Sequence, residues 1–227
     1  MTGILEIKNL TGGYGDTNVI FDLSTQIVAG QVLGVFGRNG VGKTTLARLI
    51  QGSLNPESGS LTLHGKEISH LKAHQRRARG IGYMPQTDMV FNDLTVLENL
   101  TIGKPARSLD PYFDRFPRLA ERRDQPAGTM SGGERKILAF VRTMLEGTKV
   151  IILDEPSEGV QPENIELMAQ CLRERVDAGA GAFLCEQNLS FLKDTCDHYL
   201  GIDAGKTIID RSAEDITPDE VRSALSL

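Results

Sequence analysis

The residues best able to do chemistry form a glycine-rich segment, Gly37-Arg38-Asn39-Gly40-Val41-Gly42-Lys43-Thr44, which matches the pattern Gly-x4-Gly-Lys-[Ser/Thr]. Glycines let the backbone wrap around phosphate oxygens in conformations that a side chain would obstruct. Free N–H groups and the positive end of the following helix then hold the anion. We expect Lys43 to reach the β- and γ-phosphates and the Thr44 hydroxyl to bind Mg2+. These eight residues and Thr45 are predicted to bind a nucleotide, and a chance glycine-rich turn is the weaker alternative.

Two carboxylates, Asp154 and Glu155, follow directly after the apolar run Val150–Leu153. Open α/β sheets bind ligands at the carboxyl ends of their strands, where these two side chains emerge. Asp154 suits holding Mg2+, directly or through water, and Glu155 suits a base that polarises the attacking water. Gln86 follows another apolar run and is a neutral amide that could also ligate Mg2+. A solvated acidic turn before Pro156 is the alternative, and the phosphate loop makes it less favoured.

A third segment, Ser131-Gly132-Gly133-Glu134, has the composition of a helix start. Ser131 and Glu134 are spaced as a capping box, in which each side chain bonds the other residue's backbone N–H. The two glycines leave N–H groups of the first turn open to an approaching anion. A well-capped structural helix is the alternative. The residues that would form its apolar face are Ile137, Leu138, Val141, Met144 and Leu145.

The elements that must position these groups follow from hydrophobic patterning. Val32–Phe36 is a continuous apolar run that predicts a strand entering the phosphate loop, followed by a helix from Thr44 that Gly52 ends. Val150–Leu153 and Ala182–Cys185 predict two more buried strands that flank an amphipathic helix. This alternation is typical of an α/β core with a parallel sheet.

Residues 5–10 and 19–27 alternate apolar and polar side chains and predict two half-exposed antiparallel strands. Gly12-Gly13 and Gly15 are expected to make the turn between them. At the other end of the chain, Thr217 is expected to cap a short terminal helix.

The middle of the chain shows no pattern of a buried strand between about Gln86 and Gly147. Thr95 and Glu98 are spaced as a capping box, and Asp110-Pro111 reads as a cap followed by a first-turn proline. We therefore expect one domain over 1–227 that carries an inserted helical subdomain at about 87–147.

Composition sets wider limits. The 227 residues are 40% hydrophobic and 24% charged, which is ordinary for a soluble globular chain. No apolar run approaches the roughly 20 residues of a spanning helix, and the first residues lack a signal-peptide pattern, so a cytoplasmic location is expected. Cys171, Cys185 and Cys196 have neither disulfide-framework nor zinc-site spacing. A net charge of -5 argues against nucleic acid as the main partner.

Taken in order, these residues resemble the nucleotide-binding subunit of an ATP-binding cassette (ABC) transporter. The resemblance implies a P-loop NTPase core with a mixed, mainly parallel sheet, an N-terminal antiparallel β subdomain and an inserted α-helical subdomain. It also implies ATP hydrolysis with ATP and Mg2+ as cofactors. The segments that carry it are the phosphate loop, Tyr14, Gln86, Ser131–Glu134, Asp154-Glu155-Pro156 and a switch segment around Gln187.

The resemblance assigns roles that the residues alone would not. It places Tyr14 against the adenine ring, with Val19 lining the same face, whereas Tyr14 without it reads as a core or edge-strand aromatic. It places the helix after Ser131 against the nucleotide of a second cassette, so that the active unit is a dimer.

The resemblance further implies integral membrane permease subunits and, indirectly, a periplasmic or extracellular solute-binding protein. The chain would then be peripheral on the inner face of the cell membrane. The surface near Gln86–Leu100 is the expected dock for a permease helix. Met89, Val90 and Phe91 are either contacts in that dock or part of the core of the helical subdomain.

Finer features are similar to importers for branched-chain amino acids, and especially to their urea and short-chain amide relatives. The turn Glu158-Gly159-Val160-Gln161-Pro162 favours urea or short-chain amides as the cargo, and branched-chain amino acids are the alternative. The segments that carry this similarity are 91–100, 116–129, 157–162 and 185–188.

Three positions depart from the general cassette pattern. Glu134 stands where glutamine is commonest, Gln161 where aspartate is usual, and Gln187 where histidine is usual. Gln187 is still expected to act in catalysis, because an amide can donate a hydrogen bond to a γ-phosphate, although it cannot carry a proton as an imidazole does. Such departures are similar to one of the two cassettes in amino-acid importers of this group. A non-identical partner cassette and unequal ATP sites are therefore expected.

Other classes share part of the site chemistry. A soluble non-transport cassette of the cluster-assembly type differs only by lacking the docking segment at 86–100. A GTPase or a small-molecule kinase would not explain Ser131–Glu134, and no Asn-Lys-x-Asp guanine motif occurs. A nucleotide-binding regulator without turnover is the last alternative, because of Gln187.

Overall fold

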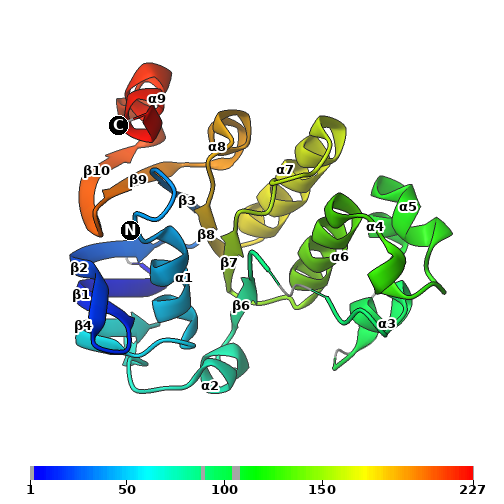
Figure 1. Cartoon of the computed structure of the whole chain (residues 1–227), viewed down its shortest axis with the longest axis horizontal. Helices are drawn as coiled ribbons and strands as arrows, with labels where there is room; N and C mark the ends of the chain where they lie inside the picture. Colours follow the sequence, from blue (N-terminus) through cyan, green and yellow to red (C-terminus); the bar gives the residue numbers. More distant parts are fainter. Residues whose placement is uncertain (1–2, 88–89, 104–107, 227) are drawn as a thin grey trace.

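The computed structural model describes residues 3–87, 90–103 and 108–226, which form two sheets with helices packed around them (Figure 1). The larger sheet is the centre of the molecule, and its strand order is β10-β9-β3-β8-β7-β6. All neighbouring pairs in it are parallel except β9 with β10, which confirms the predicted mixed, mainly parallel sheet. Its strands are β3 (Val32–Phe36), β6 (Ile81–Met84), β7 (Val150–Asp154), β8 (Gly181–Cys185), β9 (His198–Asp203) and β10 (Lys206–Ser212).

The smaller sheet is antiparallel and has the order β2-β1-β4-β5. It contains the predicted N-terminal hairpin, but Gly12-Gly13 does not lie in the turn. Strand β1 continues through these glycines to Tyr14, so the turn is confined to Gly15 and Asp16. A Cβ on Gly13 would lie 2.0 Å from the Thr17 carbonyl oxygen, so the close approach of the two strands requires glycine inside the strand. The strands are β1 (Leu5–Tyr14), β2 (Thr17–Ile27), β4 (Pro56–Leu63) and β5 (Lys66–Glu67).

The described residues also form helices, which lie between the strands in the sequence or follow the last of them. Gly52 ends α1 in the left-handed conformation, as predicted from its position. The helices are α1 (Lys43–Gln51), α2 (Ala73–Ala78), α3 (Val96–Thr101), α4 (Asp110–Arg115), α5 (Pro117–Glu121), α6 (Gly132–Leu145), α7 (Pro162–Asp177), α8 (Leu189–Thr195) and α9 (Pro218–Ser226), with short 3-10 turns η1 (Ala127–Thr129) and η2 (Ala213–Asp215).

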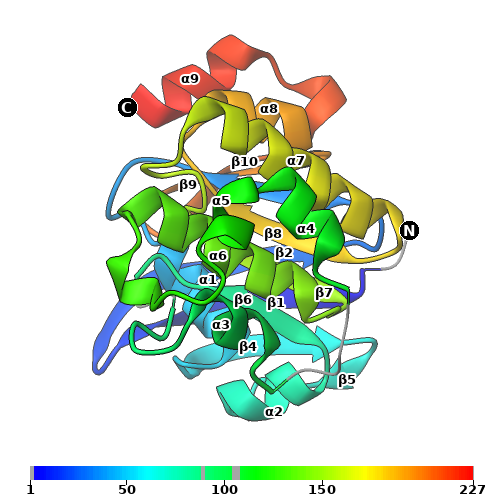
Figure 2. The ribbon, with the colours of Figure 1, turned by 90° about the vertical axis from the view of Figure 1, so that its right-hand side faces the viewer.

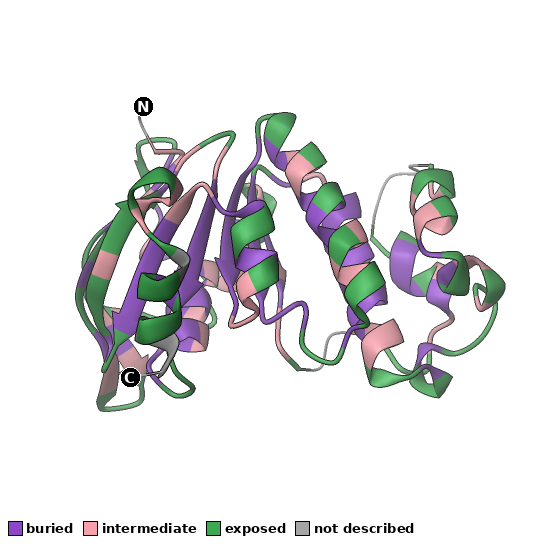
Figure 3. Cartoon of the chain, turned by 90° about the horizontal axis from the view of Figure 1, so that it is seen from above, coloured by how far each residue is buried: buried purple, intermediate pink, exposed green. Residues whose placement is uncertain are grey.

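The central strands are buried along their length (Figure 3). Their alternate side chains belong to two different cores. In β7, Ile151 and Leu153 pack in the core that contains α6 and α7. Val150 and Ile152 pack in the core that contains α1 and the antiparallel sheet. The helix after the phosphate loop and the helix after Ser131 therefore cover opposite faces of one sheet (Figures 1 and 2).

Between β6 and β7, the described residues form helices, one 3-10 turn and loops, with an isolated bridge between Thr95 and Pro126 but no strand, as the sequence predicts. The Thr95 hydroxyl accepts from the Glu98 N–H at 3.1 Å, and the Glu98 carboxylate accepts from the Thr95 N–H at 2.8 Å, which confirms that capping box. Helix α4 starts one residue earlier than predicted, because Leu109 is its N-cap and Asp110 its first residue. Figure 1 shows α3, α4 and α5 beyond α6, on its far side from the central sheet.

Candidate functional site

The phosphate loop joins the end of β3 to the start of α1, and its backbone conformation requires glycine. Gly37 has φ 145° and Gly42 has φ 116°, which lie in the region that favours glycine. A Cβ on Gly37 would also lie 2.2 Å from the carbonyl oxygen of Ile202. Gly42 is the N-cap of α1 and provides no side chain to bond the first N–H groups of the helix. The helix therefore begins with donors available to an anion.

Lys43 lies over this loop and is 4% exposed. Its ammonium donates to the carbonyl oxygens of Gly37 at 2.7 Å and Arg38 at 2.9 Å. Burial lowers the pKa of Lys43, and the negative charge of Glu155 offsets part of that shift. The charge is thus held at the mouth of a cavity of about 150 Å3, whose lining residues are Asn39, Gly40, Gly42, Lys43, Thr44, Thr45, Gln86 and Glu155.

Asp154 ends β7 beside the first turn of α1 and is fully buried. The Thr44 hydroxyl donates to its Oδ1 at 3.1 Å, and the Tyr83 hydroxyl donates to its Oδ2 at 3.4 Å. Burial raises the pKa of Asp154, and the hydrogen bond from Thr44 opposes that shift. The structure therefore brings together the hydroxyl and the carboxylate that the sequence assigns to a metal.

The donor set around Asp154 suits Mg2+ rather than a metal held by a full protein cage. Thr44 and Asp154 offer hard oxygen atoms, which Mg2+ prefers, and Gln86 lines the same cavity. Within residues 3–87, 90–103 and 108–226, no group of three or more His, Cys, Asp and Glu side chains could hold a metal. A magnesium ion here would complete its coordination with phosphate oxygens and water.

Glu155 follows Asp154 and receives two amide donors on its carboxylate. The Gln86 amide donates to Oε2 at 2.7 Å, and the Gln187 amide donates to Oε1 at 2.8 Å. Gln187 also donates to the Asn39 side-chain oxygen at 2.8 Å. Four predicted site residues from four separate segments thus meet at the mouth of the phosphate loop.

The backbone at Glu155 is held from both sides. Its φ of 49° is in the left-handed region, which is uncommon for a residue with a side chain. Its N–H donates to the Cys185 carbonyl oxygen at 2.9 Å, and its own carbonyl oxygen accepts from the Lys136 ammonium at 2.6 Å. These two bonds fix the turn that sends Asp154 and Glu155 in different directions, and φ/ψ strain of this kind occurs often at functional sites.

Tyr14 stands at the end of β1, and its side chain is 44% exposed, so it is not a core residue. Its hydroxyl accepts from Arg48, one turn along α1 from Thr44, at 3.2 Å. Val19 lies beside the phosphate loop, because a Cβ on Gly42 would be 3.3 Å from its Cγ1. Both residues are therefore near the loop that would hold the phosphates, and their contact with adenine stays a prediction.

The start of α6 has the predicted capping box. The Ser131 hydroxyl accepts from the Glu134 N–H at 3.2 Å, and the Glu134 carboxylate accepts from the Ser131 N–H at 2.8 Å. Gly132 is exposed, with no atom within 4 Å of a Cβ built on it, whereas a Cβ on Gly133 would lie 2.7 Å from the Gly159 carbonyl oxygen. Gly133 is thus needed for packing inside this chain, and Gly132 is not.

A groove of about 960 Å3 opens beside this helix start. Burial raises the pKa of Glu134, but hydrogen bonds with Ser131 and the charges of Arg122 and Arg118 outweigh burial and lower it overall. The two guanidinium groups lie 3.6 and 3.4 Å from the Glu134 carboxylate. On the other wall is Gln161, the N-cap of α7, whose side chain makes no capping hydrogen bond.

The sequence interpretation did not identify three residues that support the site: Tyr83, Lys136 and Glu186. Tyr83 bonds Asp154, and Lys136 bonds both the Glu155 carbonyl oxygen and the Glu158 carboxylate. Lys136 and Glu186 are each within two residues of a predicted site residue, and this proximity is the only signal that the sequence offered. The three cysteines, Cys171, Cys185 and Cys196, are buried and free.

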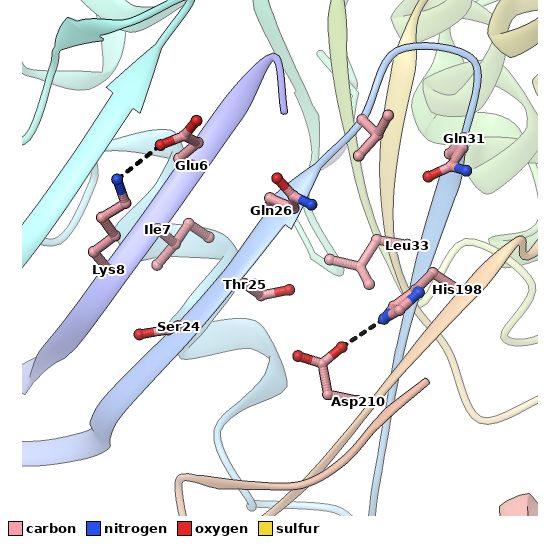
Figure 4. Close-up of a pocket in the computed structure, with 11 residues that line it drawn as sticks. Glu6, Ile7, Lys8, Ser24, Thr25, Gln26, Gln31, Leu33, His198 and Asp210 are labelled. Atoms are coloured by element: carbon pink, nitrogen blue, oxygen red, sulfur yellow. Dashed lines mark hydrogen bonds and ion pairs between the residues drawn. The ribbon is translucent and has the colours of Figure 1, made fainter. Parts of the chain in front are cut away.

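A second hollow, of about 490 Å3, lies between the two sheets at the start of β3, the end opposite to the phosphate loop. Figure 4 shows that Lys8 pairs with Glu6 and that His198 pairs with Asp210. Lys8 contacts Glu6 at 3.0 Å, and His198 contacts Asp210 at 2.5 Å. None of the predicted site residues lines it.

The chain matches known proteins over most of its length. A family model described as "ABC transporter" matches residues 20–158. The chain is 31% identical to the lipopolysaccharide export system ATP-binding protein LptB of Haemophilus influenzae, over 96% of this chain and 94% of the relative. It is 33% identical to the high-affinity branched-chain amino acid transport ATP-binding protein BraG of Pseudomonas aeruginosa, over 97% of this chain and 98% of the relative.

A solved structure of the "ATP binding subunit of ABC transporter" superposes with a TM-score of 0.87 and 25% identity, over 99% of this chain and all of that chain. No helix in the described parts of the chain is long and apolar enough to span a membrane. Together with the phosphate loop, Asp154 and Glu155, these matches show that the chain belongs to the ABC transporter family as an ATP-binding subunit that hydrolyses ATP.

Proposed function

We propose that this chain drives solute import across the cytoplasmic membrane as one of two ATP-hydrolysing cassettes in a membrane complex. The observation that carries the proposal is the separation of its two phosphate-directed helix starts. The phosphate loop and Ser131 begin helices that cover opposite faces of the central sheet. The start of α6 therefore serves a nucleotide that this chain does not itself hold.

The nucleotide of this chain binds on the phosphate loop, with Tyr14 and Val19 against its base. The positive end of α1 and the Lys43 ammonium hold the β- and γ-phosphates. The Thr44 hydroxyl, Asp154 and Gln86 would hold Mg2+, which would supply positive charge to neutralise the phosphates. A helix start in the partner cassette that corresponds to Ser131–Glu134 of this chain covers the same nucleotide from the other side.

Hydrolysis uses Glu155 as the base that takes a proton from the attacking water. Both of its carboxylate oxygens accept from amides, those of Gln86 and Gln187. The Gln187 NH2 group would donate to the γ-phosphate when ATP is bound, and the Gln86 carbonyl oxygen would be the atom available to Mg2+. Loss of the Gln187 bond would leave Oε1 of Glu155 open to the attacking water, while Gln86 still holds Oε2.

The membrane subunit docks in a groove of about 790 Å3 between α2, β6, α6 and the segment that begins at Phe91. Phe91 and Ile102 are 53% and 45% exposed there, and the Arg142 guanidinium lies 5.4 Å from the centre of the Phe91 ring. Val90 instead packs against the core that contains α6 and α7, and Met89 lies outside the described residues. The end of an apolar helix that carries a carboxylate would suit this groove. The presence of the groove favours a transporter over a cluster-assembly cassette.

The proposed complex places this chain on the cytoplasmic side of the membrane, with a solute-binding protein on the periplasmic or extracellular side. BraG, which is named for branched-chain amino acid transport, supports an importer of that group. The Glu158–Pro162 turn favours urea or short-chain amides as the cargo, and leucine-like amino acids are the second candidate.

The test is to purify the intact membrane complex and to measure ATP hydrolysis and uptake with its solute-binding protein. Urea, acetamide and leucine are offered separately. Stimulated hydrolysis and uptake with urea or acetamide is the expected result. Stimulation by leucine alone would move the cargo to the second candidate, and recovery of the chain free of any integral membrane subunit would remove the transport role.

The proposed partner cassette is a non-identical chain, because Gln187 and Gln161 make this site unequal to one with the usual residues. Purified chain alone is expected to stay monomeric with ATP when Glu155→Gln blocks turnover. A tight ATP-dependent homodimer with rapid hydrolysis in the wild type would contradict the proposal. Size-exclusion chromatography with light scattering measures the oligomeric state, and phosphate release measures the rate of ATP hydrolysis.

A further inference from the structure

Glu186 is a buried carboxylate that the mechanism above does not use. It follows the last residue of β8 and is 3% exposed. Three backbone N–H groups donate to it, from Ser157 at 3.2 Å, Gln187 at 2.7 Å and Asn188 at 3.0 Å. Backbone donors stabilise the charged form of a carboxylate inside a protein, so burial is tolerated at this position.

The two oxygens of Glu186 serve two different loops. Oε2 accepts from Ser157, in the loop that leaves Glu155. Oε1 accepts from Gln187 and Asn188, in the loop that begins α8. One carboxylate therefore ties together two loops that are separated by 29 residues in the chain.

Each of these loops carries one of the groups that meet at the attacking water. Ser157 lies two residues after Glu155, and the Gln187 amide donates to the Glu155 carboxylate at 2.8 Å. We infer that Glu186 is a positioning residue for ATP hydrolysis. Its carboxylate fixes the backbone of Gln187 relative to the loop that carries Glu155. The inference rests on the proposed roles of Glu155 and Gln187.

A carboxylate is needed because both acceptor atoms are in use. Glutamine at this position keeps one oxygen, but its NH2 group is only a donor and would face an N–H group. Glu186→Gln is nearly isosteric, yet it must break the bond to Ser157 or the pair to Gln187 and Asn188. The variant therefore disconnects the loops with little change in volume.

The expected result is a fall in kcat and an unchanged ATP affinity. None of the three hydrogen bonds of the Glu186 carboxylate reaches the phosphate loop, and its charge affects the pKa of Lys43 less than the charge of Glu155 does. Misplacing a reacting group by about 1 Å costs roughly 100-fold in rate. We expect kcat for Glu186→Gln in the complete complex to fall roughly 10- to 100-fold, with KM within about twofold of the wild type.

A double-mutant cycle with Gln187→Ala separates positioning from simple structural support. If Glu186 acts through Gln187, then Glu186→Gln costs little more once the Gln187 amide is gone. The matched control is Asp194→Asn, a carboxylate-to-amide change at an exposed residue of α8, and its kcat is expected to equal the wild type. Should Glu186→Gln fail to fold, Glu186→Asp keeps both oxygens on a shorter stem and is expected to lower kcat less, again at constant KM.

Three outcomes would overturn the inference. These are a kcat of Glu186→Gln equal to that of Asp194→Asn, a full additional loss on the Gln187→Ala background, or a loss of ATP affinity that accounts for the lower turnover. Wild-type and Glu155→Gln complexes are assayed in parallel. Equal turnover of these two would remove the proposed base itself, whereas a large difference between them with a normal Glu186→Gln would remove only the role of Glu186.

Discussion

The helix that follows the phosphate loop and the helix that follows Ser131 begin in different ways. Helix α1 starts at Gly42, which is buried, has a left-handed backbone and offers no capping side chain. Helix α6 starts at Ser131, which is exposed and is capped by a reciprocal pair with Glu134. Helix α1 leaves its first backbone N–H groups available to an anion. In helix α6, the Ser131 side chain already accepts from one of these N–H groups, that of Glu134.

The surroundings of the two helix starts differ in the same sense. Around α1, this chain supplies Lys43, Asp154, Gln86 and Glu155, which are the proposed phosphate donor, metal ligands and base, all from one polypeptide. Around Gly132, the chain supplies an open groove with no atom within 4 Å of an added Cβ. This chain thus supplies most of the groups around the phosphate loop, and the start of α6 has fewer such groups of its own, as expected if it faces the nucleotide of the proposed partner cassette.

The largest effect is expected from removing the base on the phosphate-loop side. Glu155→Gln should lower kcat of the complete complex about 10²- to 10⁴-fold, because the water loses its proton acceptor. ATP affinity should be kept, since the loop and Lys43 are unchanged. Phosphate release measures kcat, and equilibrium binding measures the ATP affinity. Turnover within tenfold of the wild type would exclude Glu155 as the base.

A matched pair of variants compares the two helix starts directly. Lys43→Ala removes a charged donor to the phosphates and should weaken ATP binding by the isolated chain by about 1.5 to 3 kcal/mol, roughly 10- to 100-fold. Ser131→Ala should leave that affinity within about twofold, because Ser131 lies on the other face of the sheet. In the complete complex both variants should lower turnover. Weaker ATP binding by isolated Ser131→Ala would contradict the separation of the two sites.

The cap of α6 is expected to have a smaller effect, on stability. Ser131→Ala removes the acceptor for the Glu134 N–H and should lower the free energy of unfolding by about 1 kcal/mol. Glu134→Gln keeps a side-chain acceptor for the Ser131 N–H and is the milder control. Urea denaturation of the isolated chain gives both values. An unchanged stability in Ser131→Ala would show that the cap does not contribute to the fold.

The smallest effect distinguishes a structural glycine from a functional one. Gly132→Ala should raise the free energy of unfolding by about 0.4 to 1 kcal/mol, because the added methyl meets no atom and the unfolded chain loses freedom. Turnover of the complete complex should nevertheless fall, since the methyl faces the approaching nucleotide. Gly133→Ala is the contrast, because its methyl meets the Gly159 carbonyl oxygen and should destabilise the chain itself. Normal turnover in Gly132→Ala would argue against a nucleotide at α6.

Local patterns predicted the central strands, α1 and α6 well, and the smaller strands poorly. Strand β4 begins with proline, serine and glycine, which favour turns, and it becomes a strand through its pairing with β1. The hairpin of β9 and β10 was not predicted either, because most side chains of β10 are exposed and show no regular alternation. The expected turn at Gly12-Gly13 was wrong for a related reason, since glycine signals both turns and close strand contacts.

The sequence by itself determined the chemistry that depends on neighbours in the chain. The phosphate loop, the capping boxes and the apolar strand runs each involve a few consecutive residues, whose local backbone preferences are enough to define them. Only the tertiary structure decided which of these segments meet. Gln86 and Gln187 are 69 and 32 residues from Glu155, and folding brings one amide to each of its carboxylate oxygens. Likewise, only the packing of α1 and α6 on opposite faces of the sheet separates the two anion-directed helix starts, because side chains alternate across a buried strand.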